Sequence, residues 1–138
     1  MRDIIFDTEN CKIYWDSSNK IIFWEPLNKM SSDEFRNSFI FGFEKALELS
    51  NNFNNINWVN LVENVKVANV DDLKWLTTYS GEMAEKIGIK KVAFTKPKDI
   101  FGWTGITIYT KLANNKLKNL TIKYFSNEDD AIDWIKIK

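Results

Sequence analysis

The C-terminal segment, residues 120–135, most narrowly limits the folds open to this chain. Apolar and polar residues alternate from Leu120 to Tyr124, a period of two that is typical of a β-strand. Ser126 follows and stands three residues before Asp129, the spacing of a capping box, so a helix is expected to begin at Ser126. A strand that leads directly into a short helix is a unit of the α/β folds.

Near the N-terminus, two strand patterns are separated by a polar turn. Cys11–Trp15 and Ile21–Trp24 are rich in apolar residues, and Asp16–Lys20 between them contains the Asp, Ser and Asn that favour turns. We therefore expect an antiparallel hairpin. Its second strand is apolar on both faces, so it is expected to lie inside a sheet, and Pro26 ends it because proline cannot donate to a strand ladder.

Capping residues mark two further helices. Ser31 and Glu34 form a capping box, and the helix that they open is expected to run to about Asn51. Asn69 opens a second helix, and Gly88 is expected to end it as a C-cap. The core stripe of the first helix is predicted to be Phe35, Phe39, Phe43, Ala46 and Leu49.

Two more strands are predicted, one at Ile56–Val62 that contains Trp58 and a short, apolar one at Lys91–Thr95. Residues 99–115 leave two alternatives open. Apolar residues and glycines recur there at helical spacing, whereas Ile106–Thr110 has the β-branched composition of a strand. We predict a helix.

This alternation after a hairpin predicts an α/β fold in the order β-β-α-β-α-β-α-β-α. We expect one mixed sheet, an initial antiparallel hairpin followed by parallel strands, flanked by about four helices. At 138 residues the chain is expected to be one domain, residues 1–138. Aromatic residues make up 14% of the chain, and those expected in the core include Trp15, Trp24, Trp58 and Trp134.

The net charge and the single cysteine indicate which partners and which cell compartment to expect. Nineteen basic residues balance nineteen acidic ones, so we expect no nucleic-acid binding. No segment has the length and apolarity of a membrane span, and residues 1–7 lack a signal-peptide core, so no membrane insertion is expected. Cys11 has no second cysteine to pair with, which suits a cytoplasmic protein, and we interpret it as a strand residue rather than a reactive thiol.

No catalytic or cofactor motif is visible in the sequence. Histidine is absent, and the five glycines form neither a Walker nor a dinucleotide-binding pattern, so we expect no enzyme activity, metal or cofactor. One alternative stays open, because hydrolysis would gain support if several carboxylates met at the strand ends of the sheet. The carboxylates concerned are Glu63, Asp71, Asp72 and Asp99.

Four aromatic residues lie off the predicted core stripes of their helices and are candidates for binding a partner or ligand. They are Phe41, Trp75, Tyr79 and Trp103. Clustered exposed aromatics bury a large area at low entropic cost, although these four could equally belong to the core. Gly102 and Gly105 flank Trp103 and indicate either close packing of a helix start or a flexible entrance to an apolar pocket.

Several segments together resemble a known family, the small bacterial SpoIIAA-like proteins with the STAS fold of anti-sigma-factor antagonists. The likeness covers nearly the whole chain and rests on the order and spacing of its motifs. These are Ile21–Trp24, Ser32–Arg36, Trp58–Leu61, Asp72–Leu76, Gly88–Phe94 with Pro97 and Phe101-Gly102, and Tyr124-Phe125 with Trp134. The resemblance implies a mixed sheet flanked by helices and no known catalytic activity.

The chain departs from the switching members of this family at one place. Those members carry a phosphorylatable serine near the start of the helix that corresponds to the second one here, but residues 63–72 contain neither Ser nor Thr. Asn69, Asp71 and Asp72 occupy the helix start, where acidic side chains complement the helix dipole. A phosphorylation switch is therefore not expected there.

The resulting functional hypothesis is a non-enzymatic regulatory or protein-interaction module of the STAS type. The alternative is binding of a small apolar or lipid-like ligand in a pocket between helices and sheet, held by Trp75, Tyr79 and Trp103. A homodimer formed through Phe41 or through the flank that carries Trp75 and Tyr79 is also expected. The sequence names neither a partner nor a ligand.

Overall fold

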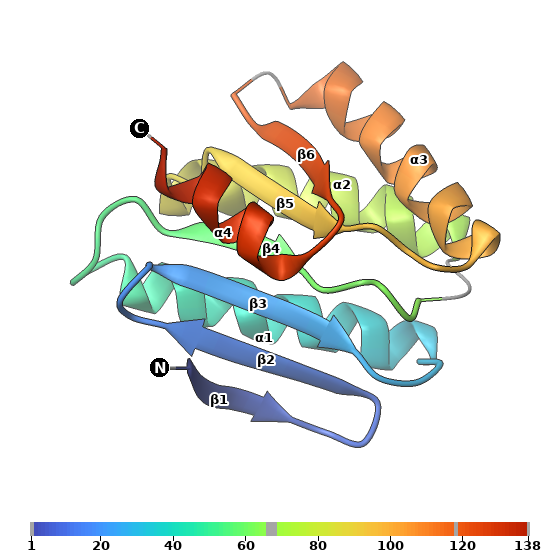
Figure 1. The fold of residues 1–138 in the computed structure, drawn as a ribbon, viewed down its shortest axis with the longest axis horizontal. Helices are drawn as coiled ribbons and strands as arrows, with labels where there is room; N and C mark the ends of the chain where they lie inside the picture. The colour runs from blue at the N-terminus through green and yellow to red at the C-terminus, as the bar shows by residue number, and fades with distance from the viewer. Residues whose placement is uncertain (1, 66–68, 118, 138) are drawn as a thin grey trace.

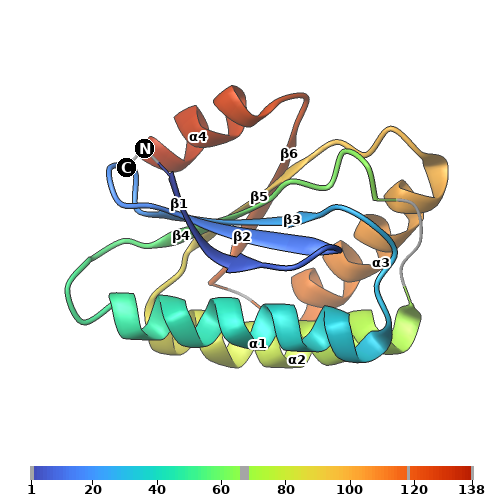
Figure 2. The same cartoon turned by 90° about the horizontal axis from the view of Figure 1, so that it is seen from below.

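The computed structural model describes residues 2–65, 69–117 and 119–137. A central sheet separates three helices on one face from a fourth helix on the other (Figures 1 and 2). The elements are β1 (Arg2–Asp7), β2 (Cys11–Asp16), β3 (Ile21–Pro26), α1 (Ser32–Leu49), β4 (Asn57–Asn60), α2 (Val70–Ile87), β5 (Lys91–Thr95), α3 (Ile100–Lys116), β6 (Thr121–Phe125) and α4 (Glu128–Lys136).

The six strands lie in the order β1-β2-β3-β4-β5-β6. β1, β2 and β3 pair antiparallel, and β3 to β6 pair parallel. The parallel connections each contain a helix, α1, α2 or α3, because a parallel crossover needs a long connection. The predicted α/β fold with one mixed sheet is confirmed.

β1 is absent from the predicted order of elements. Its register with β2 shifts between Ile4 and Phe6, which marks a bulge or irregularity. An extra residue in one strand breaks the alternation of side chains between the two faces. The run from Ile4 to Phe6 is apolar throughout and lacks the period of two that predicts β6.

The predicted helix caps are confirmed at three of four places. Ser31 and Glu34 form the expected capping box, and the Asn69 side chain accepts a hydrogen bond from the backbone of Asp72. Gly88 ends α2 in the left-handed conformation with φ of 91°. The prediction for the last helix was wrong by one residue, since Asn127 rather than Ser126 caps α4.

Residues 100–115 are helical within α3, so the helix predicted at 99–115 is confirmed except at its first residue. β4 is shorter than the predicted strand at Ile56–Val62, although Ile56 and Val62 are both buried beside it. The segment between β4 and α2 includes residues 66–68, so part of the region without Ser or Thr lies outside the described residues.

Apolar side chains form a core on each face of the sheet. The larger core lies under α1, α2 and α3 and includes Trp15, Trp24 and Trp58, as predicted. The smaller core lies under α4 and centres on Phe23, Val59 and Ala93. Trp134 was expected in the core but is only partly buried, because it packs on Phe125 at the edge of the smaller core.

Candidate functional site

A cavity of about 820 Å³ lies between the sheet and the three helices on its first face. Its floor is formed by inward-facing residues of β3, β4 and β5, while α1, α2 and α3 supply the opposite wall. Ligand pockets in proteins usually measure roughly 300–1,000 Å³. The space is therefore large enough for a small organic molecule.

The register of three parallel strands determines the floor. Trp24, Asn60 and Phe94 are register partners on β3, β4 and β5, and Trp58 pairs with Val92 two residues earlier. All five residues line the cavity. Residues two apart on a strand point to the same face, so these side chains share one surface. Asn60 is the polar member of an otherwise aromatic and aliphatic floor.

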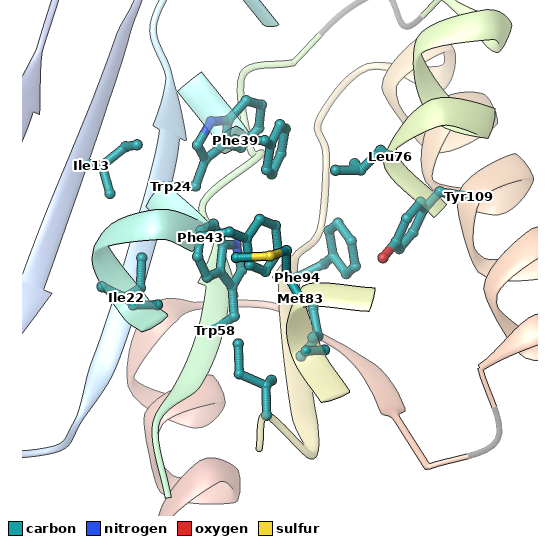
Figure 3. Close-up of a cluster of buried hydrophobic side chains, with 14 of the residues drawn as sticks. Ile13, Ile22, Trp24, Phe39, Phe43, Trp58, Leu76, Met83, Phe94 and Tyr109 are labelled. Atoms are coloured by element: carbon teal, nitrogen blue, oxygen red, sulfur yellow. The ribbon is translucent and has the colours of Figure 1, made fainter. Parts of the chain in front are cut away.

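Stacked aromatic rings build the wall that α1 contributes. Phe43 stacks on Trp58 with 4.3 Å between ring centroids, and Phe39 stacks on Trp24 at 4.2 Å. Figure 3 shows Leu76 and Tyr109 across from Phe39, on the side of the other helices. The large rings hold one helix against the sheet and give the cavity a flat, apolar side.

The cavity opens at the end of the sheet where β3 and β4 finish. Residues that line it there are exposed, including Leu27, Asn28, Lys29, Asn64 and Asn69. Ile89 and Leu120, which precede β5 and β6, contribute to the opposite end. The cavity thus runs along the strands from a polar mouth into an apolar interior.

The cavity is open at its mouth, so water as well as a small molecule can enter it. Buried water needs two to four polar partners, and most of the inner lining is apolar apart from Asn60, Ser80 and Tyr109. The inner part of the cavity therefore has the lining expected of a site for an apolar group.

A buried carboxylate joins two of the helices beside the cavity. Both oxygens of Asp72 accept from the Ser32 hydroxyl at 2.7 Å, and Oδ1 also accepts from Arg36 Nε at 2.8 Å. The Asp72 side chain is 6% exposed, whereas that of Arg36 is 37% exposed. The guanidinium also lies 5.3 Å from the centre of the Trp75 ring. Asp72 thus ties the first turn of α2 to α1.

The four aromatic candidates from the sequence are not brought together in this cavity, and none of them lines it. Phe41 is 39% exposed on α1, and its ring contacts Phe6 of β1 at a centroid distance of 5.0 Å. Trp75 and Tyr79 are partly buried and stack on each other at 5.1 Å. Trp103 is partly buried against Tyr124 at 5.6 Å.

Gly102 and Gly105 both line the cavity. A Cβ at Gly102 would lie 2.4 Å from the Val65 carbonyl oxygen and 2.9 Å from Pro97 Cβ. Such contacts are too short for any side chain, so the close packing suggested by the sequence is confirmed at Gly102. The start of α3 can approach the loop after β4 only because this position lacks a side chain.

The carboxylates considered for hydrolysis do not meet in one cleft. Asp72 lines the cavity, whereas Glu63 lines a second, small pocket of about 80 Å³ that shares Pro26 and Asn64 with the cavity lining, and neither Asp71 nor Asp99 lines either space. Within residues 2–65, 69–117 and 119–137, no group of three or more His, Cys, Asp or Glu side chains could hold a metal ion. No helix in that part of the chain is long and apolar enough to cross a membrane.

Cys11 lies on the floor of the larger core and is 1% exposed. Burial raises the pKa of its thiol to about 12 from an ordinary value of 9.0. We expect Cys11 to react with a thiol reagent at pH 8 only after unfolding, because the thiolate is the reactive form. The unfolded chain releases this proton first, so the contribution of Cys11 to stability is complete below about pH 9 and is lost towards pH 12.

A time course with dithionitrobenzoate, with and without denaturant, measures this protection. Rapid labelling of the folded protein at pH 8 would contradict the burial of Cys11.

The family of the chain follows from its sequence comparison. The model of the SpoIIAA-like family matches residues 21–136, from the start of β3 to the end of α4. The chain belongs to the SpoIIAA-like family. The resemblance to this family, found from the sequence motifs, is thereby confirmed. The family indicates a regulatory or protein-interaction module of the STAS type. Comparisons with curated proteins and with solved structures give no match.

Three polar residues of the cavity were not identified from the sequence of this SpoIIAA-like protein. They are Asn60, Ser80 and Tyr109, which all line the cavity and are buried. Asn60 carried a usable signal, since a polar residue stands there between the apolar residues Val59 and Leu61 of a predicted strand. Ser80 and Tyr109 carried none, because helical periodicity does not show which residues of different helices meet.

Proposed function

We propose that this chain is a non-enzymatic regulatory module of the STAS type that binds a small apolar or lipid-like ligand between its helices and its sheet. The observation that carries the proposal is the cavity of about 820 Å³, with aromatic walls and a mouth at one end of the sheet. Family membership supports a regulatory role, and the separation of the carboxylates supports a role without catalysis.

A titration with the uncharged fluorescent probe N-phenyl-1-naphthylamine tests this proposal. The probe emits strongly only outside water, so we expect a saturable rise in emission at one probe per chain. Emission from Trp58 in the cavity floor should fall as the probe binds. Phe41→Ser is the matched control, because Phe41 lies outside the cavity lining and its loss should leave the affinity unchanged. A titration without saturation would remove the proposal.

A second candidate function, contact with a protein partner, is favoured by the exposed ring of Phe41. Phe41 and Phe6 form a two-ring patch where α1 passes the edge strand β1. We propose that a second copy of the chain binds this patch, since exposed aromatic clusters favour protein contacts. We propose no nucleic-acid partner, because the formal net charge is zero.

Sedimentation at micromolar concentration tests the homodimer. A wild-type dimer that dissociates on Phe41→Ser would support it, and a wild-type monomer at every concentration would rule it out. The flank formed by Trp75 and Tyr79 remains the alternative contact surface. A dimer that persists in Phe41→Ser would favour that flank, although both rings are partly buried.

A further inference from the structure

The hydrogen-bonding state of Asn60 limits what the cavity can bind. Asn60 is 5% exposed, and its side-chain oxygen accepts from Trp58 Nε1 at 2.9 Å. An indole nitrogen can only donate, so the amide oxygen must be the atom that faces it. This contact fixes the orientation of the amide and turns Nδ2 away from Trp58.

The Asn60 amide nitrogen has no hydrogen-bond partner among the described residues. It is not sealed in the protein either, because no described side-chain nitrogen or oxygen is both fully enclosed and unpartnered. The nitrogen therefore borders open space, and the space that Asn60 borders is the cavity. Two N–H donors on a buried residue face the place where a ligand would lie.

A second donor comes from two buried hydroxyl groups. The oxygens of Ser80 and Tyr109 lie 3.1 Å apart and share one hydrogen bond, and both residues line the cavity. Two hydroxyl groups carry two hydrogens, so one hydrogen remains after this bond is made. Neither hydroxyl group makes a second hydrogen bond with the described residues. Figure 3 shows the Tyr109 hydroxyl pointing inward from α3.

The cavity lining contains few charged residues. Among the described lining residues only Lys29 and Asp72 are charged. Lys29 is exposed at the mouth, and Asp72 is already paired with Arg36. An anionic group deep in the cavity would meet no countercharge there, and burying an unpaired charge is costly. The free N–H groups of Asn60, the apolar walls and the absence of a cation from the described interior together favour an uncharged ligand that carries an acceptor oxygen.

We propose that the ligand of this cavity is an uncharged molecule with an apolar, flat body and a carbonyl oxygen that accepts from Asn60 Nδ2. This inference rests on the proposed ligand-binding function and specifies its ligand class. The rings of Phe43 and Trp58 both line the cavity and provide apolar contact for the body. A ligand that places a carboxylate deep in the cavity is disfavoured, because the charged lining residue Lys29 lies at the mouth.

Three naphthalenes that differ in one substituent test the inference: 2-acetylnaphthalene, 2-ethylnaphthalene and 2-naphthoate. Their dissociation constants are measured by displacement of N-phenyl-1-naphthylamine from the wild type and from Asn60→Leu. Loss of one net hydrogen bond should weaken the ketone by about 3- to 10-fold in Asn60→Leu. The hydrocarbon should bind that variant equally well or better, and the naphthoate should bind the wild type more weakly than the ketone.

Equal changes for ketone and hydrocarbon, or tightest binding of the naphthoate, would overturn the inference. Absence of binding by all three compounds would instead contradict the proposed function. A measurement on the wild type alone avoids any folding defect of the variant. The infrared carbonyl stretch of bound 2-acetylnaphthalene should lie below its frequency in hexane, because a hydrogen bond weakens the C=O bond. A stretch equal to that in hexane would also overturn the inference.

Discussion

Replacing Asp72 by alanine is expected to lower the free energy of unfolding by about 2–3 kcal/mol. Asp72 accepts hydrogen bonds from Ser32 and Arg36 and is almost fully enclosed. Hydrogen bonds to charged groups contribute roughly 1.5–3 kcal/mol, and breaking a fully buried ion pair costs about 3–5 kcal/mol. The lower part of this combined range applies because Arg36 is partly exposed and regains water when its partner is removed.

Asp71→Ala is the matched control for this prediction. Asp71 stands in the same first turn of α2 but is exposed. Both variants lose one negative charge near the helix N-terminus, an effect of about 0.3–1 kcal/mol. Urea denaturation of the two variants therefore isolates the link between α1 and α2. Equal losses in Asp71→Ala and Asp72→Ala would show that the link contributes nothing.

Replacing Ala84 by tryptophan is expected to fill part of the cavity and to weaken binding of N-phenyl-1-naphthylamine by about tenfold, or ~1.4 kcal/mol. Ala84 lies on α2 and, like Ile89 and Val92, lines the cavity. We expect a larger side chain at this place to enter the cavity instead of displacing neighbours. Stability should stay unchanged or rise, because burying an apolar side chain contributes roughly 1.5–3 kcal/mol.

Ala113→Trp makes the same change at a buried position that does not line the cavity. Ala113 lies on α3, is 1% exposed and does not line the cavity. Overpacking there should cost about 1–3 kcal/mol or more, while probe affinity per folded molecule should change little. Thermal denaturation and the probe titration give both readouts. Similar destabilisation of Ala84→Trp and Ala113→Trp would mean that no space exists beside α2.

Local signals in the sequence predicted most of the architecture. Three helix ends were identified from the capping box at Ser31, the cap at Asn69 and the glycine at position 88. Each of these signals depends only on residues within one helical turn. The start of α4 was wrong by one residue because Ser126 and the adjacent Asn127 are equally suited to capping. β1 was not predicted, because apolar and polar residues do not alternate along the part of the strand where its register shifts.

The cavity could not be predicted in the same way. Periodicity shows which side chains face inward, but not how far apart two layers stand when large rings meet between them. The stacks of Phe39 on Trp24 and Phe43 on Trp58 set that separation, and they depend on the pairing of α1 with β3 and β4. Trp75 and Tyr79 lie off the core stripe yet stack on each other, so position on a helix face did not identify the residues that line the cavity.

An open, mostly apolar space lies between the sheet and α1, α2 and α3. Diffraction from crystals pressurised with xenon tests it most directly, because xenon enters apolar cavities that water leaves dry. We predict anomalous density for xenon, or density for a resident molecule, between Phe39, Leu76 and Ile106, which all line the cavity. Side chains packed together at that place, with neither xenon nor another molecule between them, would contradict the account.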